Sequence, residues 1–158
     1  MQMGEDQVFS FTLDHVEFFV PDRAQAAEWY GRVLGCRPVP GTEQWAAHPQ
    51  GPLMLSPDGG RTKLALFAGE PQGRRPTAGF HRVAFRLSGA EWLRFVARLT
   101  EFGLAEGSDA ARVVDHTGAW SVYFTDPFGH HLEVTTYEAD VVRQARGAAR
   151  AAPSSSAG

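Results

Sequence analysis

Hydrophobic residues first alternate along the chain and then recur at a helical period. Val16, Phe18 and Val20 alternate with unlike neighbours, which is the period of a strand with two different faces. Asp22 is a suitable N-cap, and apolar residues then follow at i, i+3, i+4, i+7 and i+8 until Gly35. The pattern over residues 13–35 therefore predicts a strand, a turn and a helix.

The second half of the chain repeats this order. Apolar residues alternate from Val83 to Leu87, Ser88 and Glu91 form a capping box, and a second helix is expected to end at Gly103. After each helix, Gly and Pro separate short strand-like segments. We expect these strands at about 37–40, 43–47, 52–56 and 62–68, and again at about 112–114, 118–125 and 130–137. The pattern is strand, helix and three strands, twice.

The chain of 158 residues is long enough for one domain or for two small modules that share a core. We expect an α+β fold with five consecutive parts. These are an N-terminal extension 1–12, a βαβββ module 13–69, a Pro- and Gly-rich linker 70–79, a second βαβββ module 80–138 and a tail 139–158, which ends in a Pro-Ser run and is expected to be frayed.

Composition and charge narrow the possible partners. The formal net charge of −3 gives no reason to expect nucleic acid or an anionic membrane as a partner. No apolar run reaches the ~18–20 residues of a membrane span. The single Cys36 excludes a disulfide within the chain and fits a reducing compartment. We therefore expect a cytoplasmic protein with a small-molecule ligand.

Residues 114–133 carry a histidine, a tyrosine and a carboxylate at close spacing, with an Asp-Pro-x-Gly turn before the carboxylate. Pro127 presets φ and Gly129 tolerates positive φ, so the strand before the turn is expected to fold back on the strand after it. The hairpin would place Tyr123 beside Glu133.

This run resembles the signature of the type I extradiol ring-cleaving dioxygenases. These enzymes belong to the vicinal-oxygen-chelate superfamily, with glyoxalase I and the fosfomycin-resistance proteins. The resemblance covers about residues 13–137. It implies that the two modules are related by a pseudo-twofold and form a half-open mixed β-barrel cleft with the helices outside.

The same resemblance implies a metal site. His15 occupies the position of the first metal ligand, Glu133 that of the ligand on the last strand, and the first strand of the second module provides a third. Two histidines and a carboxylate form a facial triad, which lets Fe(II) bind a chelating substrate and O₂ together. Mn(II), Ni(II) and Zn(II) are the alternative ions.

The third ligand depends on how the two modules are aligned. Strand alternation matches His15 to Arg82, whereas helix alignment matches His15 to His81. The two alignments put different side chains into the cavity, because side-chain direction reverses at every residue of a strand. We expect His81 to be the ligand and Arg82 to point to the helix side or to a dimer edge. An inward Arg82 would instead favour a metal-free pocket for an anion or a drug.

His116 and Tyr123 match second-sphere residues of the ring-cleaving enzymes, which hydrogen-bond substrate and oxygen intermediates. An imidazole can pass protons, and a phenol can donate a hydrogen bond without carrying charge. The resemblance therefore implies that both residues handle protons.

The leading interpretation is a mononuclear divalent-metal enzyme, an Fe(II) extradiol-type dioxygenase that acts on a small catecholic or vicinal-oxygen compound. One alternative is another metal-dependent reaction on this fold, such as epoxide opening or isomerisation. Residues 61–67 lack the acidic fourth ligand of glyoxalase-type sites, which counts against the isomerase. The other alternative is a metal-free binding protein of the bleomycin-resistance type. We expect a homodimer, because a chain of two modules leaves a cavity that a partner can complete.

Overall fold

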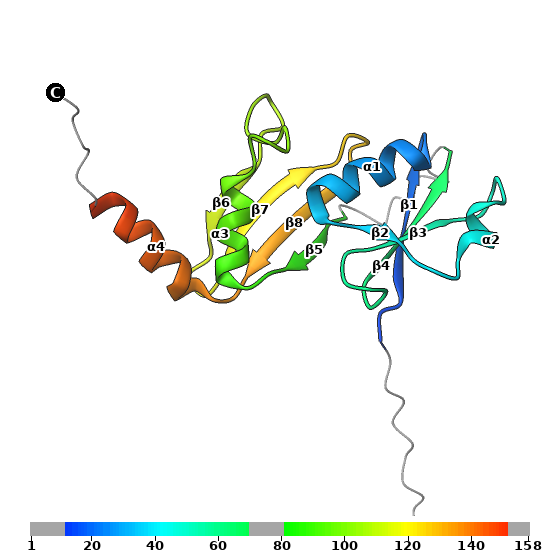
Figure 1. Ribbon diagram of the computed structural model, residues 1–158. Helices are drawn as coiled ribbons and strands as arrows, with labels where there is room; N and C mark the ends of the chain where they lie inside the picture. The colour runs from blue at the N-terminus through cyan, green and yellow to red at the C-terminus, as the bar shows by residue number, and fades with distance from the viewer. Residues whose placement is uncertain (1–11, 70–80, 152–158) are drawn as a thin grey trace, which may run out of the picture. The chain divides into compact units, whose positions relative to one another are not determined.

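The computed structural model describes residues 12–69 and 81–151. They belong to two compact units, Met1–Gln72 and Gly73–Gly158. The predicted linker 70–79 lies outside the described residues, as do most of the N-terminal extension and the last residues of the tail. The prediction of a frayed tail is wrong over residues 139–151, because these form a helix whose Ala139 and Val142 are buried. Each unit contains one four-stranded mixed sheet and helices, which confirms the α+β class and the two βαβββ modules (Figure 1).

Unit 1 follows the predicted order and adds one short helix. Its strands pair in the order β1-β4-β3-β2, with β1 parallel to β4 and the other pairs antiparallel. The elements are β1 (His15–Val20), α1 (Arg23–Leu34), β2 (Arg37–Pro38), α2 (Glu43–Ala46), β3 (Leu53–Ser56) and β4 (Lys63–Ala68). Asp22 caps α1 by accepting from the backbone N–H groups of Ala24 and Gln25, as expected.

Unit 2 repeats the sheet of unit 1. Its strands pair in the order β5-β8-β7-β6, with β5 parallel to β8. The elements are β5 (Val83–Arg86), α3 (Gly89–Ala97), β6 (Arg112–Asp115), β7 (Trp120–Thr125), β8 (His131–Thr136) and α4 (Ala139–Ala151). The capping box of Ser88 and Glu91 is present at the start of α3. This helix is shorter than expected, since it ends at Ala97 and turns lead from there to Gly103.

The core of each unit lies between its sheet and its long helix. In unit 1, Tyr30 of α1 lies against Phe18 of β1, with ring centroids 6.3 Å apart. In unit 2, the fully buried Trp92 of α3 donates from Nε1 to the carbonyl of Val134 at 3.0 Å. Alternate residues of every strand therefore face away from these helices, and we call this side of each sheet its distal face.

The predicted strand at 43–47 is wrong, because this segment contains the helix α2. The Glu43 carboxylate accepts from the backbone N–H of Gly41 and so holds the start of the turn. Arg23 reaches from α1 and donates to the carbonyls of Ala46 and Gly51 at 3.1 and 2.5 Å. These contacts come from a residue 23 and 28 positions away, so alternation along the segment could not reveal them.

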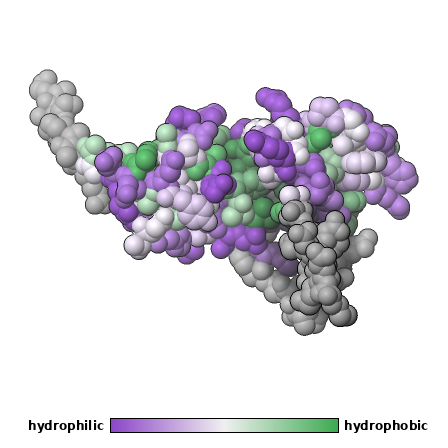
Figure 2. Space-filling model, turned by 90° about the horizontal axis from the view of Figure 1, so that it is seen from below, coloured by the Kyte–Doolittle hydropathy of each residue, from purple (hydrophilic) through white to green (hydrophobic). Residues whose placement is uncertain are grey.

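The surface is mostly hydrophilic on the side shown in Figure 2, with hydrophobic residues in limited areas. Among the described residues, the large apolar side chains that stand exposed are Leu13, Trp45, Tyr137 and Val141. Within the same part of the chain, no helix has the length and apolar character needed to cross a membrane.

Candidate functional site

His15 begins β1 and lies on the distal face of unit 1, where β1 pairs it with Lys63 of β4. Its Nδ1 lies 2.8 Å from the Asp14 carboxylate, and Lys63 Nζ donates to the other oxygen of Asp14 at 2.7 Å. These hydrogen bonds, first from Lys63 and then from His15, hold the pKa of the Asp14 carboxyl below its usual value. With Nδ1 held by a carboxylate, Nε2 is the ring nitrogen left to bind a further group.

A pocket of about 510 Å³ opens beside His15. Its polar end contains His15 and Glu17, with Glu17 Oε1 3.6 Å from His15 Nε2. Its apolar side includes Trp45 and Phe67, and Phe67 stacks on Phe19 with ring centroids 5.6 Å apart. The residues that line it are Asp14, His15, Glu17, Val39, Thr42, Trp45, Pro52, Met54, Lys63 and Phe67. The pocket therefore joins charged groups to an apolar wall.

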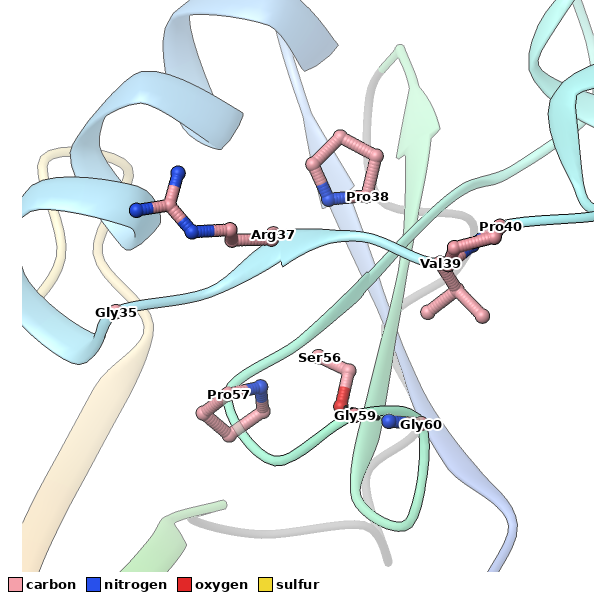
Figure 3. A pocket seen from close by; sticks show the side chains of 9 residues that line it. All are labelled: Gly35, Arg37, Pro38, Val39, Pro40, Ser56, Pro57, Gly59 and Gly60. Carbon is pink, nitrogen blue, oxygen red and sulfur yellow. Dashed lines mark hydrogen bonds between the residues drawn. The ribbon is translucent and has the colours of Figure 1, made fainter.

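A second pocket of about 360 Å³ in unit 1 is formed by β2 and the turn between β3 and β4 (Figure 3). Its lining is mainly proline, valine and glycine, with Arg37 as its ionisable side chain. The hydroxyl of Ser56 already bonds to Asp58 at 2.9 Å and accepts from the N–H of Gly60 at 2.7 Å. This lining offers little chemistry, so we place the candidate site at the pocket beside His15.

In unit 2, the predicted hairpin is confirmed. β7 and β8 pair Tyr123 directly with Glu133 on the distal face. Gly129 has a φ of 92° in the turn, and the Asp126 carboxylate accepts from the N–H of His130 at 2.8 Å. Ser121 donates its hydroxyl to Glu133 Oε1 at 2.6 Å. Glu133 is thus an oriented carboxylate that keeps one oxygen for another partner.

His116 and Tyr123 form a hydrogen-bonded pair, with His116 Nε2 2.7 Å from the Tyr123 hydroxyl. His116 sits in the turn between β6 and β7, where its N–H donates to the carbonyl of Ala119 at 2.8 Å. Thr117 has a φ of 70° in this turn, and Arg143 of α4 donates to its carbonyl. The C-terminal helix therefore supports the turn that presents His116 to Tyr123.

Arg82 lies over the ring of Tyr123, with its guanidinium carbon 4.4 Å from the ring centroid. The prediction that Arg82 points to the helix side is wrong. Ala84 pairs with Glu133, and alternation carries Arg82 to the same distal face as Ala84. The contact of a cation with an aromatic ring also favours this placement. His81 is exposed and lies two residues before β5, so sheet pairing does not fix its side, and its role as a ligand stays a prediction.

The proposed metal ligands are distributed over both units. Within the described residues of either unit, no group of three His, Cys, Asp or Glu side chains is placed to hold a metal ion. The imidazole of His15 and the carboxylate of Glu133 fit a divalent ion by donor chemistry, whereas a guanidinium does not.

Sequence reasoning missed several residues that surround the candidate ligands, namely Asp14, Glu17, Lys63, Ser121 and Arg112. Two of them left a signal in the sequence, because Asp14 adjoins His15 and Glu17 shares its strand face. Arg112 lies 5.6 Å from the Tyr123 ring centroid, through a strand pairing that no local pattern shows.

A sequence profile of the Glyoxalase/Bleomycin resistance protein/Dioxygenase superfamily matches residues 12–134. The chain belongs to this superfamily. A comparison with curated proteins finds no match to the chain.

Solved structures share the fold at low sequence identity. The fosfomycin resistance protein FosX from Mesorhizobium loti is 22% identical with a TM-score of 0.56, over 81% of this chain and 93% of that chain. Oxidase ChaP-H1 is 24% identical with a TM-score of 0.58, over 80% of this chain and 96% of that chain. A FosX variant from Listeria monocytogenes, solved with Mn(II) and 1S,2S-dihydroxypropylphosphonic acid, is 14% identical with a TM-score of 0.61, over 84% and 97%.

Proposed function

We propose that the protein is a mononuclear divalent-metal enzyme that acts on a small molecule with two neighbouring oxygens. His15 and Glu133 are two of its protein ligands. The observation that carries the proposal is the hydrogen bond that the Asp14 carboxylate accepts from His15 Nδ1 at the wall of a pocket. Histidines that bind metals almost always have their second ring nitrogen held in this way. The sequence predicts His81 as the third ligand, and the position of Arg82 reopens that choice.

The reaction that we propose first is Fe(II)-dependent extradiol ring cleavage. A bound Fe(II) ion would supply positions for a chelating substrate and for O₂. The apolar wall with Trp45 and Phe67 suits the ring of such a substrate. Tyr123 would donate its hydroxyl proton to a substrate oxygen, and His116, 2.7 Å away and exposed, would take up a proton from solvent and pass it to the tyrosinate oxygen.

A metal-free binding protein is the second candidate, because Arg82 is a permanent cation on the face that carries Glu133. In this case Arg82 and Tyr123 would hold an anionic or planar ligand.

The FosX neighbour that was solved with Mn(II) supports the metal-dependent class, and the oxidase supports oxygen chemistry within the same fold. Other metal-dependent reactions, epoxide opening among them, share the ligands of the first candidate and lack oxygen consumption.

Metal analysis separates the two candidates. Protein purified without chelator and loaded anaerobically with Fe(II), Mn(II) or Zn(II) should hold one ion per chain. Glu133→Gln should lower the occupancy sharply, and Glu106→Gln, a change at an exposed residue, should leave it unchanged. Empty wild-type protein after all three loadings would contradict the metal enzyme and favour the binding protein.

Oxygen uptake tests the reaction. Fe(II)-loaded protein should consume O₂ with at least one member of a panel of catechols and form a ring-opened product. Background consumption across the panel, with the metal bound, would exclude ring cleavage of catechols and direct attention to epoxide opening or isomerisation. The predicted homodimer stays a prediction, and sedimentation equilibrium of the loaded protein would test it.

A further inference from the structure

The two units place different residues at the same point of the repeat. The alternation that matches Val20 to Leu87 also matches His15 to Arg82, and both of these side chains lie on distal faces. A guanidinium carries donors only and cannot bind a metal ion. The place in unit 2 that corresponds to His15 therefore provides no ligand, and a third protein ligand has to come from elsewhere.

Glu17 has the position that such a ligand needs. It follows His15 by two residues on β1, so both side chains leave the same face of the strand. Its Oε1 lies 3.6 Å from His15 Nε2, and both residues line the same pocket. Two ligand atoms that bind one ion at right angles with bonds of about 2.1 Å are about 3 Å apart. A small rotation of the Glu17 side chain would bring its oxygen to that separation.

The charges around His15 also favour binding of a cation. Asp14 and Glu17 both approach the imidazole, one at each ring nitrogen, and Lys63 neutralises only Asp14. With a neutral imidazole the group retains one excess negative charge, which lies on Glu17. A divalent ion at His15 Nε2 and Glu17 Oε1 would offset this charge and leave Asp14 as the partner that orients the ring.

We infer that Glu17 is a ligand of the divalent ion and binds it beside His15 on β1. The inference rests on the proposed metal-dependent function. It replaces a set of two histidines and one carboxylate by a set of one histidine and two carboxylates. Because carboxylates are harder ligands than imidazole, the site should favour Mn(II) and Fe(II) relative to Ni(II) and Zn(II) more than a site with two histidines does.

Metal titration of the full chain tests the inference without using activity. Mn(II) is added to the wild type and to Glu17→Gln, His81→Ala and Glu28→Gln, and free Mn(II) is followed by electron paramagnetic resonance. Glu28 is an exposed residue of α1 and serves as the matched control. We expect Glu17→Gln to weaken binding at least tenfold, while His81→Ala and Glu28→Gln bind as the wild type does.

The outcomes are distinguishable. Binding by Glu17→Gln within twofold of the wild type would overturn the inference and leave the metal enzyme intact, and a loss in His81→Ala alone would restore His81 as the third ligand. A wild type that binds neither Mn(II), Fe(II) nor Zn(II) would overturn both proposals. If Glu17→Gln fails to fold by circular dichroism, Glu17→Asp takes its place, and its shorter carboxylate should also bind more weakly than the wild type.

Discussion

The distal faces of the two sheets have the same strand order and different chemistry. In unit 1, the distal face presents His15 with carboxylates on both sides and a pocket with an apolar wall. In unit 2, it presents a tyrosine between a histidine, two arginines and one carboxylate, as the contacts of Tyr123 show. The repeat therefore reproduces a backbone plan and not a site.

The helix-facing sides of the two sheets show why this is possible. Phe18 and Val20 in β1 and Val83 and Phe85 in β5 are all apolar, because each packs toward a helix. Packing sets strict limits on these residues, whereas His15, Glu17 and Tyr123 on the distal faces keep part of their surface in solvent. Each unit can therefore carry different functional groups on one common frame.

The largest expected effect concerns the hydrogen-bonded pair of His116 and Tyr123 in unit 2. Tyr123→Phe removes the hydroxyl that lies 2.7 Å from His116 Nε2, and His116→Ala removes its partner. Either change should lower turnover by about 10²–10⁴-fold, the usual scale for a lost proton-transfer group, with metal occupancy retained. Tyr137→Phe alters an exposed tyrosine on the same chain and should have no effect. If occupancy falls as much as turnover, the pair contributes to metal binding, and the two units differ less in their roles.

A smaller effect concerns the support of His15 in unit 1. Asp14→Asn weakens the hydrogen bond to His15 Nδ1 and removes the charge that pairs with Lys63. Loss of such a supporting carboxylate lowers metal affinity by about 10–100-fold. Titration with Mn(II), against Asp109→Asn as an exposed control, measures the change. Unchanged affinity would mean that His15 does not depend on its neighbour and would weaken its assignment as a ligand.

The third test gives unit 2 a histidine at the position that corresponds to His15 at the start of β1 in unit 1. Arg82→His places an imidazole where the repeat has His15 in unit 1 and removes a cation from the same face. We expect metal affinity to rise by roughly tenfold, which is about 1.4 kcal/mol. Arg86→His makes the same exchange four residues later on the same strand side and should not raise the affinity. A lower affinity in Arg82→His would show that Arg82 supports the site as an arginine.

The smallest effect concerns stability and compares the turns that close the two hairpins. The carboxylate of Asp58 accepts from the N–H of Thr62 at 2.7 Å, and that bond is the main cause that lowers the pKa of Asp58 to about 2. A carboxyl with a lowered pKa stabilises the fold above its ordinary value of 3.8, and this stabilisation disappears as the pH falls toward 2.

Asp58→Asn should therefore lower the melting temperature by a few degrees at most at pH 7, and the difference from the wild type should shrink between pH 4 and pH 3. Thermal unfolding followed by circular dichroism at these pH values measures it. A constant difference across the range would show that the amide disturbs the turn for a reason other than charge.

Asp126→Asn in the unit 2 turn should lower the melting temperature at pH 7 by more than Asp58→Asn does, because the side chain of Asp126 is fully buried against His130.

Local pattern was enough to predict most of the frame. Alternation and helical spacing predicted both βαβββ modules, and the Asp-Pro-x-Gly turn predicted the pairing of Tyr123 with Glu133. These features depend on neighbours within a few residues, so the sequence displays them directly. The helix α2 was missed because Arg23, 23 residues before Ala46, binds the last carbonyl of the helix and also the carbonyl of Gly51 in the loop that follows.

The sequence by itself determined the backbone plan, the superfamily and the residues with chemistry to offer, His15, His116, Tyr123 and Glu133. Only the tertiary structure decided which groups surround them. Lys63 reaches Asp14 across 49 positions, and Arg82 reaches the ring of Tyr123 across 41. The alignment of the two strands that carry His15 and Arg82 was ambiguous by one residue in the sequence. Sheet pairing resolves it for Arg82, since hydrogen bonds to β8 fix which side chains of β5 share a face with Glu133.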